Sequence, residues 1–293
     1  MSLLEYQRAL GFILTDRKFR AAFFAGDEQA GSRFDLTERE RESLLAMRRD
    51  RVMLHSHLLA HGRLELGFMA FPLTAEIVHR STGDEAEDFC EAFPPLPEAR
   101  GTLLVEADRV YAYFHPRLEA GEIAHPWVAD LMRFEYTQVQ LGADLDAWHS
   151  SVVAGEPGDD TLDPRSGYPY CGQHVRLLEF TYPVYDVMTR LEDGERIDTL
   201  DRLPEPAQVL MFKTPGSPWV RSYRVNRATA DLVRACDGTR TVTDVLTELR
   251  HTYGSGVERG ALAALDKLRA EGLAILLPQH RQPQAPAAGQ SQS

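Results

Sequence analysis

Cysteine is scarce in this sequence, and the three cysteines follow no known pattern. Cys90, Cys171 and Cys236 are widely spaced and odd in number, so we predict neither a disulfide framework nor a CxxC zinc site. The sequence also has no apolar run long enough to span a bilayer. Its first residues carry Glu5 and Arg8 within an apolar stretch and lack the basic start of a signal peptide. Together these features predict a cytoplasmic protein with no membrane partner.

Positive charge is also in short supply. The formal net charge is −12, which argues against a general nucleic-acid binder. The charge is uneven, because basic residues outnumber acidic ones between Pro206 and Leu277. An acidic first part and a mildly basic last part indicate two units with different functions.

Recognisable catalytic motifs are missing from the sequence. It contains no GxSxG motif, no P-loop and no Rossmann glycine pattern. His57 and His61 share a helix face at a spacing that can hold a metal, but no HExxH pattern accompanies them and Glu65 is the nearest carboxylate on that face. We therefore predict solvent-exposed histidines, no metal or other cofactor in this chain, and no enzyme activity of its own. Glu135 is interpreted as a buried anchor for a loop, and Cys236 as a small packed hydrophobe.

The first half of the chain has the periodicity of helices. Hydrophobic residues make up 43% of the sequence and charged residues 26%, which is typical of a globular protein. Thr15 is expected to cap the second helix, and Thr37 with Glu40 forms a capping box that opens a long helix reaching Leu59. Gly62 is expected to end or break that helix. Helices are expected near residues 3–12, 15–26, 37–62, 70–80, 85–93, 103–115 and 126–141, an all-α bundle.

The second half has a different texture. Residues 155–170 are rich in Gly, Pro and Asp and are predicted to link a domain at 1–154 to one at 171–279. The tail at 280–293 lacks core-forming residues and is predicted to be disordered. Asn226 and Thr243 are each expected to cap a helix. A third helix is expected at 257–271. Strands are predicted at 174–182, 207–213, 219–225 and 273–277, with a short helix at 183–191. Residues from 207 onward thus have a winged-helix-like order, in an α+β chain.

Three motifs in the second half resemble the PqqD family. They are Tyr223 to Ala230 (YRVNRATA), Cys236 to Val242 (CDGTRTV), and Tyr253 followed by a helix and Glu271-Gly272-Leu273. The family comprises the peptide chaperone of pyrroloquinoline quinone biosynthesis and the precursor-peptide recognition elements of ribosomal peptide maturation. The resemblance implies a small antiparallel sheet plus a three-helix bundle that binds a precursor peptide.

Three shorter motifs resemble the HvfC/BufC peptide-modification chaperones. They are Leu4 to Ala9 (LEYQRA), Leu131 to Tyr136 (LMRFEY) and Leu177 to Val184 (LLEFTYPV). The family pattern prefers Trp where Tyr136 stands. Those chaperones are accessory partners of multinuclear non-haem iron oxidative enzymes. The resemblance implies a heterodimer in which the partner enzyme, not this chain, holds the iron.

The segment from Trp219 to Val225 is the candidate peptide-binding strand. An extended peptide can add to an open strand edge, where it gains main-chain hydrogen bonds. The helix from Val257 faces this strand by family analogy, with a core stripe of Glu258, Ala261, Leu262, Leu265 and Leu268. Trp219 and Tyr223, taken singly, are expected to pack in the core. The predicted peptide-binding residues are Trp219, Val220, Arg221, Ser222, Tyr223, Arg224, Val257, Gly260, Ala264 and Lys267.

The resemblances imply a non-catalytic accessory protein. It would bind a ribosomally made precursor peptide and present it, often through a Cys, to the iron enzyme, as a required subunit of a heteromeric peptide-modifying enzyme. Two alternatives stay open, a winged-helix transcription regulator and a free-standing metalloenzyme that uses the histidines. DNA binding is disfavoured by the net charge and because Arg259, Lys267 and Arg269 fall on different helix faces.

Overall fold

Helices and two small antiparallel sheets are both present, as the α+β prediction requires. The computed structural model describes residues 3–78, 85–93, 102–143, 165–214, 217 and 219–278. The chain divides into two compact units. The first consists of Met1–Tyr136 and Tyr185–Thr199, and the second of Thr137–Val184 and Leu200–Ser293. This division differs from the predicted boundary after residue 154, because most of the 184–192 helix groups with the first unit.

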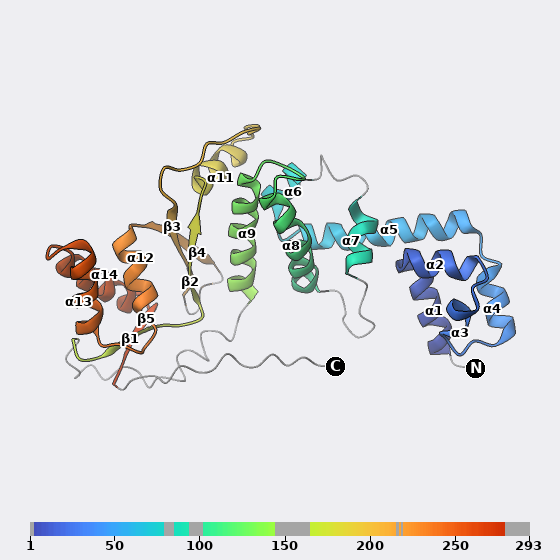
Figure 1. Ribbon diagram of the computed structural model, residues 1–293, viewed down its shortest axis with the longest axis horizontal. Helices are drawn as coiled ribbons and strands as arrows, with labels where there is room; N and C mark the ends of the chain where they lie inside the picture. The colour runs from blue at the N-terminus through green and yellow to red at the C-terminus, as the bar shows by residue number, and fades with distance from the viewer. Residues whose placement is uncertain are drawn as a thin grey trace. The chain divides into compact units, whose positions relative to one another are not determined.

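Helices account for the regular structure of the first unit (Figure 1). A long helix, α5, contacts α1 near its start, and α7 and α8 further along. α9 begins in the first unit and ends in the second. The helices are α1 (Leu3–Thr15), α2 (Arg17–Phe24), α3 (Glu28–Ser32), α4 (Glu38–Leu45), α5 (Arg49–Phe68), α6 (Pro72–Val78), α7 (Glu85–Ala92), α8 (Leu103–Glu119), α9 (Trp127–Ala143) and α11 (Val184–Glu192).

Helix ends in the first unit follow side-chain capping, with three corrections to the predictions. The capping box of Thr37 and Glu40 is confirmed at the start of α4. The expected single long helix is wrong, because α4 ends at Leu45 and α5 begins at Arg49. Gly62 neither ends nor breaks α5. Asp16, and not Thr15, caps α2, since its carboxylate accepts from the Phe19 N–H at 2.8 Å.

Two close contacts hold the middle of the first unit together. A Cβ atom on Gly67 of α5 would lie 2.8 Å from the Glu106 carbonyl oxygen of α8, so only glycine allows the two helices to approach so closely. Glu135 of α9 is buried and accepts from the backbone N–H of Leu73 at 2.8 Å and of Thr74 at 3.1 Å. The prediction that Glu135 is an anchor is confirmed, with the start of α6 as the anchored segment.

A three-stranded antiparallel sheet forms the centre of the second unit. Its strands are β2 (Val175–Phe180), β3 (Ala207–Lys213) and β4 (Val220–Val225), in the order β2-β3-β4. β3 pairs with both neighbours, with Leu210 opposite Leu177 on one side and opposite Tyr223 on the other. β3 is apolar and buried over most of its length, which is typical of a central strand.

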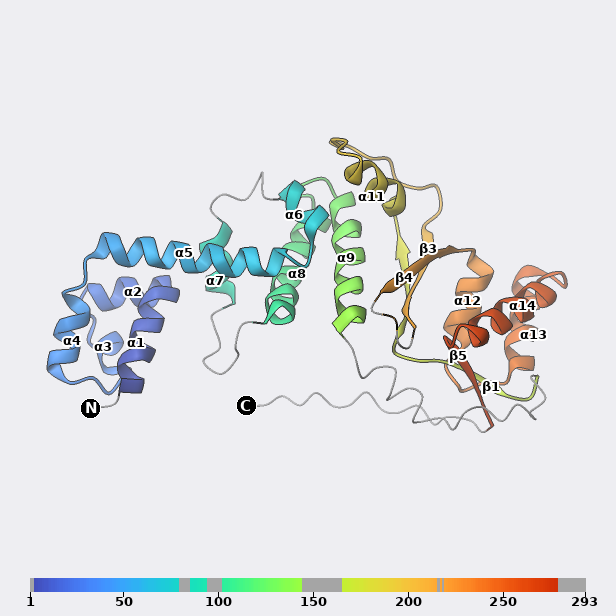
Figure 2. The same cartoon turned by 180° about the vertical axis from the view of Figure 1, so that it is seen from behind.

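Three helices cover one face of this sheet. They are α12 (Arg227–Ala235), α13 (Val242–Tyr253) and α14 (Val257–Ala270), which contact one another, and α12 also contacts β2 and β3. They lie next to the sheet (Figure 2). Together with it they form one apolar core. Its buried members include Leu210, Phe212, Leu232, Val233, Val245, Leu246, Leu249, Ala261, Leu265 and Leu268.

A second, two-stranded sheet joins the ends of this unit. β1 (Tyr168–Cys171) pairs antiparallel with β5 (Ala274–Leu277). β1 was not predicted, and it begins inside the expected linker. Gly167, just before β1, packs closely against β5, because a Cβ atom there would lie 3.1 Å from the Leu276 side chain. Residues 155–164 of the linker, part of the turn before β4, and the tail at 280–293 lie outside the described residues.

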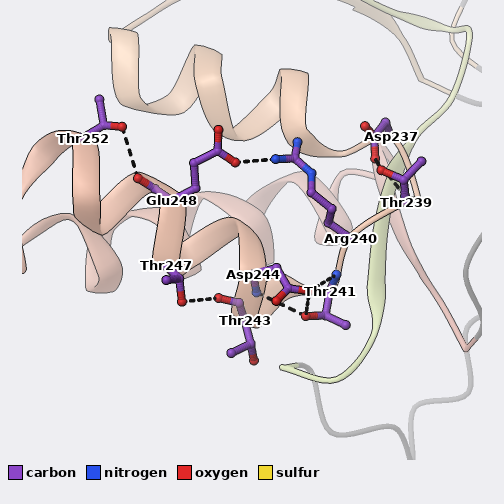
Figure 3. Close-up of polar contacts among 9 residues, drawn as sticks. All are labelled: Asp237, Thr239, Arg240, Thr241, Thr243, Asp244, Thr247, Glu248 and Thr252. Carbon is purple, nitrogen blue, oxygen red and sulfur yellow. Dashed lines mark hydrogen bonds and ion pairs between the residues drawn. The ribbon is translucent and has the colours of Figure 1, made fainter.

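The loop between α12 and α13 is held by side chains (Figure 3). Thr241, not the predicted Thr243, caps α13 in a capping box with Asp244. Arg240 pairs with Glu248, about two turns into the helix. Thr243 instead donates from its hydroxyl to the Arg165 carbonyl at 2.9 Å, which joins the loop to the segment leading into β1.

No helix within the described ranges is long and apolar enough to cross a bilayer.

Candidate functional site

β4 lies at the edge of the three-stranded sheet. It pairs with β3 from Val220 opposite Lys213 to Val225 opposite Gln208. Within the described part of the chain, no strand pairs with its other side. Its outer N–H and C=O groups are therefore available to another extended chain.

The two faces of β4 differ in their surroundings. Arg221, Tyr223 and Val225 alternate along the face that bears the helices, since Tyr223 lies 5.5 Å from Phe212 between ring centroids and Val225 packs against the same core. Val220, Ser222 and Arg224 lie on the other face.

Two large aromatic side chains of this segment are exposed. The exposed fraction is 75% for Trp219 and 45% for Tyr223. The expectation that each packs in the core is therefore wrong. Sequence periodicity shows which residues share a face of a strand, but not whether another layer of the fold covers that face.

α14 reaches β4 at Lys267, whose ammonium nitrogen lies 5.8 Å from the centroid of the Tyr223 ring. This contact brings together the two predicted halves of the site. Val257 and Ala264 are half-buried against the core cluster. Gly260 is exposed, and a Cβ atom there would meet no atom within 4 Å, so the surface of α14 is open at this point.

One residue of the predicted core stripe on α14 is not in the core. Ala261, Leu265 and Leu268 are buried, and Leu262 packs against them. Glu258 instead accepts from Arg165 at 3.1 Å. Its carboxylate thus joins α14 to the segment before β1.

Unpaired positive charge accompanies the open edge. The side chains of Arg221 and Arg224 are exposed and make no hydrogen bond or ion pair with any residue that the structure describes. Arg234 of α12, by contrast, pairs with Asp231 at 2.6 Å. Lys267 is 4.0 Å from Glu271 and largely exposed. The open edge therefore has cations on both faces of β4, in a chain of net charge −12.

Buried and half-buried polar contacts fix the sheet against the helices. Gln208 of β3 donates to Glu179 of β2 at 2.7 Å and accepts from Arg234 of α12 at 2.6 Å. Asp231 accepts from Tyr253 of α13, which raises the pKa of that tyrosine. Sequence reasoning missed this network, because its members lie far apart along the chain and form no motif.

The histidines of α5 form a pair without a third ligand. The rings of His57 and His61 have centroids 4.2 Å apart, and His57 Nδ1 lies 4.0 Å from a Glu87 oxygen. Among the described residues, no group of three His, Cys, Asp or Glu side chains is placed to hold a metal ion.

The chain matches no model of a known protein family, and no curated protein matches it either. We therefore infer its function from the geometry of β4 and α14 and from the sequence motifs. The open edge, the exposed aromatic rings and the cations provide means of binding an extended chain.

Proposed function

We propose that this protein is a non-catalytic accessory protein of ribosomal peptide maturation, whose second unit binds a precursor peptide. The peptide lies along the open edge of β4 and beside α14. The observation that carries this proposal is that, among the described residues, no strand pairs with the outer side of β4 at the place where Lys267 of α14 meets Tyr223. The strand and helix order from β2 to β5 supports a PqqD-like winged-helix module as the fold of this unit.

Strand addition explains what each part of the site contributes. The main chain of β4 gives hydrogen bonds, and alternate peptide side chains point toward α14 or away from it. On the α14 side, Tyr223 and Trp219 offer apolar surface, and Gly260 and Ala264 leave room for peptide side chains. Arg221 and Arg224 are placed to pair with acidic peptide residues. Their charge also opposes the pairing of β4 with a second copy of itself.

The first unit docks a multinuclear iron-dependent oxidative enzyme, which holds the iron and performs the reaction. Exposed apolar side chains on α5 support this part of the proposal. They are Met53, Leu54, Leu58 and Leu59, and solvent-exposed apolar clusters mark interaction surfaces. Presentation of a bound peptide, often through a Cys, raises its effective concentration at the enzyme to the order of millimolar for short flexible tethers.

The two alternative functions have less support. A DNA-reading helix needs free basic residues on one face, whereas Arg269 of α14 lies 3.8 Å from Asp266. A metalloenzyme needs further ligands beside His57 and His61. Retention of duplex DNA at physiological salt, or stoichiometric iron or zinc in the isolated chain, would favour these alternatives.

The test begins with co-purification of the chain with the products of its neighbouring reading frames. We expect an iron enzyme and a short Cys-bearing peptide among them. The labelled peptide is then titrated against the full chain. Failure of any neighbouring peptide to bind contradicts the proposal.

A pair of proline variants locates the binding edge. Successive residues of a strand direct their N–H groups to opposite edges. Of Arg221→Pro and Ser222→Pro, one therefore removes a bond to β3 and the other an outward donor. The variant that keeps its unfolding midpoint is expected to bind the peptide about fivefold more weakly, the equivalent of one hydrogen bond. Arg221→Ala and Ser222→Ala, which keep the N–H, control for the side chains. Full affinity in the folded proline variant contradicts pairing along β4.

A further inference from the structure

Two of the three cysteines lie opposite each other in the second unit. Cys171 ends β1, and Cys236 is the residue that follows α12. The Cys171 N–H donates to the Cys236 carbonyl at 2.8 Å, and the Gly238 N–H donates to the Pro169 carbonyl at 2.8 Å. Tyr170 and Asp237, between these two bonds, form an antiparallel bridge. Cys171 and Cys236 therefore lie opposite each other and share one backbone hydrogen bond, while the Cys236 N–H bonds to the Leu232 and Val233 carbonyls of α12.

This register places the two thiols on the same side. Directly opposite residues of an antiparallel pair project to the same face, and their Cα atoms are about 4.5–5.5 Å apart. That spacing lies within the range of about 4.4–6.8 Å found for disulfides. Both side chains also reach the same apolar core, in which Cys236 is buried and Cys171 is half-buried.

The surroundings give the two thiols different reactivity. A hydrogen bond with the Cys171 side chain, and then burial, raises the pKa of Cys236 well above its usual range. Cys236 therefore stays protonated at neutral pH. Cys171 is the more accessible of the two, so a reagent from solution meets it first.

We propose that Cys171 and Cys236 are a reversible redox modification site that a small-molecule disulfide oxidises to an intramolecular disulfide. The Cys171 thiolate attacks one sulfur of the reagent, which forms a mixed disulfide and expels one thiolate. Cys236 loses its proton to solvent and attacks Cys171 Sγ, which expels the second thiolate. Two protein thiols are thus oxidised, and one reagent disulfide is reduced to two thiols.

The bond would join two segments that flank β4 in the sequence. The closed loop runs from β1 through β2, β3 and β4 to the end of α12. Cross-linking such a loop restricts the unfolded chain, and the effect grows with loop length. Oxidation is therefore a way to stabilise the second unit without any change at β4, and it does not depend on the proposed function.

The test treats the full chain with glutathione disulfide, alkylates it in denaturant and measures its intact mass. The wild type is expected to lose two of its three free thiols with no glutathione attached, and peptide mapping is expected to join Cys171 to Cys236. Cys236→Ser is expected to stop at a glutathione adduct on Cys171. Cys171→Ser is expected to remain unmodified at Cys236. Cys90→Ser, in the first unit, is the matched control and should oxidise as the wild type does.

Three results would overturn the proposal. They are three free thiols after treatment, a persistent glutathione adduct on wild-type Cys171, or a bond that includes Cys90. A second readout is thermal. Oxidation should raise the unfolding temperature of the second unit by about 5–10 °C in the wild type, and leave it unchanged in Cys171→Ser.

Discussion

The ammonium group of Lys267 lies 5.8 Å from the centre of the Tyr223 ring. One residue belongs to the last helix of the second unit, and the other to its edge strand. The contact marks where the main chain of β4, left unpaired on its outer side within the described residues, runs beside α14. Under the proposed function, a bound peptide passes this point.

Loss of the Tyr223 ring is expected to weaken peptide binding. Tyr223→Ala should raise the Kd for the neighbouring-frame peptide about 5- to 30-fold, as is usual for an aromatic residue at the centre of an interface. Tyr223→Phe keeps the ring and should bind as the wild type does. Fluorescence anisotropy of the labelled peptide measures both. Equal affinity of the alanine variant and the wild type would show that the peptide does not contact this ring.

Charge reversal at the edge is expected to select against acidic peptides. Arg221→Glu and Arg224→Glu should each weaken binding about 3- to 10-fold at low salt, and the difference should shrink as salt increases. Arg250→Glu makes an equal charge change at an exposed position of α13 and should have little effect. The titrations are repeated at two salt concentrations. If all three variants lose the same affinity, the effect is one of net charge and not of these positions.

Glu135 is expected to stabilise the first unit through the start of α6. Glu135→Ala leaves the Leu73 and Thr74 N–H groups and the Thr74 hydroxyl without their acceptor, which should cost about 2–4 kcal/mol of unfolding free energy. Glu135→Gln keeps one oxygen and should cost less. Glu42→Ala, at an exposed site, should stay within about 0.5 kcal/mol. Urea unfolding measures all three. A loss below 0.5 kcal/mol in Glu135→Ala would mean that water replaces the carboxylate.

His174 is expected to make the second unit less stable in mild acid. Burial lowers the pKa of His174. Its hydrogen bond to the Gly272 carbonyl raises the pKa, but by less. The folded state therefore holds the ring neutral, while the unfolded chain takes up a proton near pH 6.5. The unfolding free energy should be at its full value above this pH and fall as the pH drops below it.

Amide exchange of β3 reports on this dependence. Between pH 7.5 and 5.5, protection should fall more in the wild type than in His174→Gln, whose amide can also donate to Gly272. His115→Gln is the control, because burial lowers the pKa of His115 too, but that residue lies in the first unit. The same pH dependence in wild type and His174→Gln would rule out this histidine as the cause.

The sequence predicts best those elements whose signals are local. The bounds of β3 at Ala207–Lys213 are confirmed, because a continuous apolar run follows Pro206. The capping box at Thr37 is also confirmed, since its two side chains lie within one turn. α14 was predicted to within one residue, because glycines flank an amphipathic repeat.

The elements that were missed depend on distant partners. β1 contains Pro169 and follows Gly167, a composition typical of a linker, and it is a strand because β5 and the loop after α12 supply its hydrogen bonds. The capping assignments at Thr15 and Thr243 were wrong by one and two residues, because several nearby side chains can act as caps. The exposure of Trp219 and Tyr223 was not predicted, because alternation along a strand does not show whether other elements cover its faces.

Amide hydrogen exchange of β4 with and without the peptide tests the central claim most directly. The full chain is saturated with the labelled peptide from the neighbouring reading frame, and exchange is followed residue by residue. The account predicts slower exchange at alternate amides between Val220 and Val225, the ones that point away from β3, with smaller changes in β2. A saturating peptide that leaves every β4 amide unchanged would contradict it.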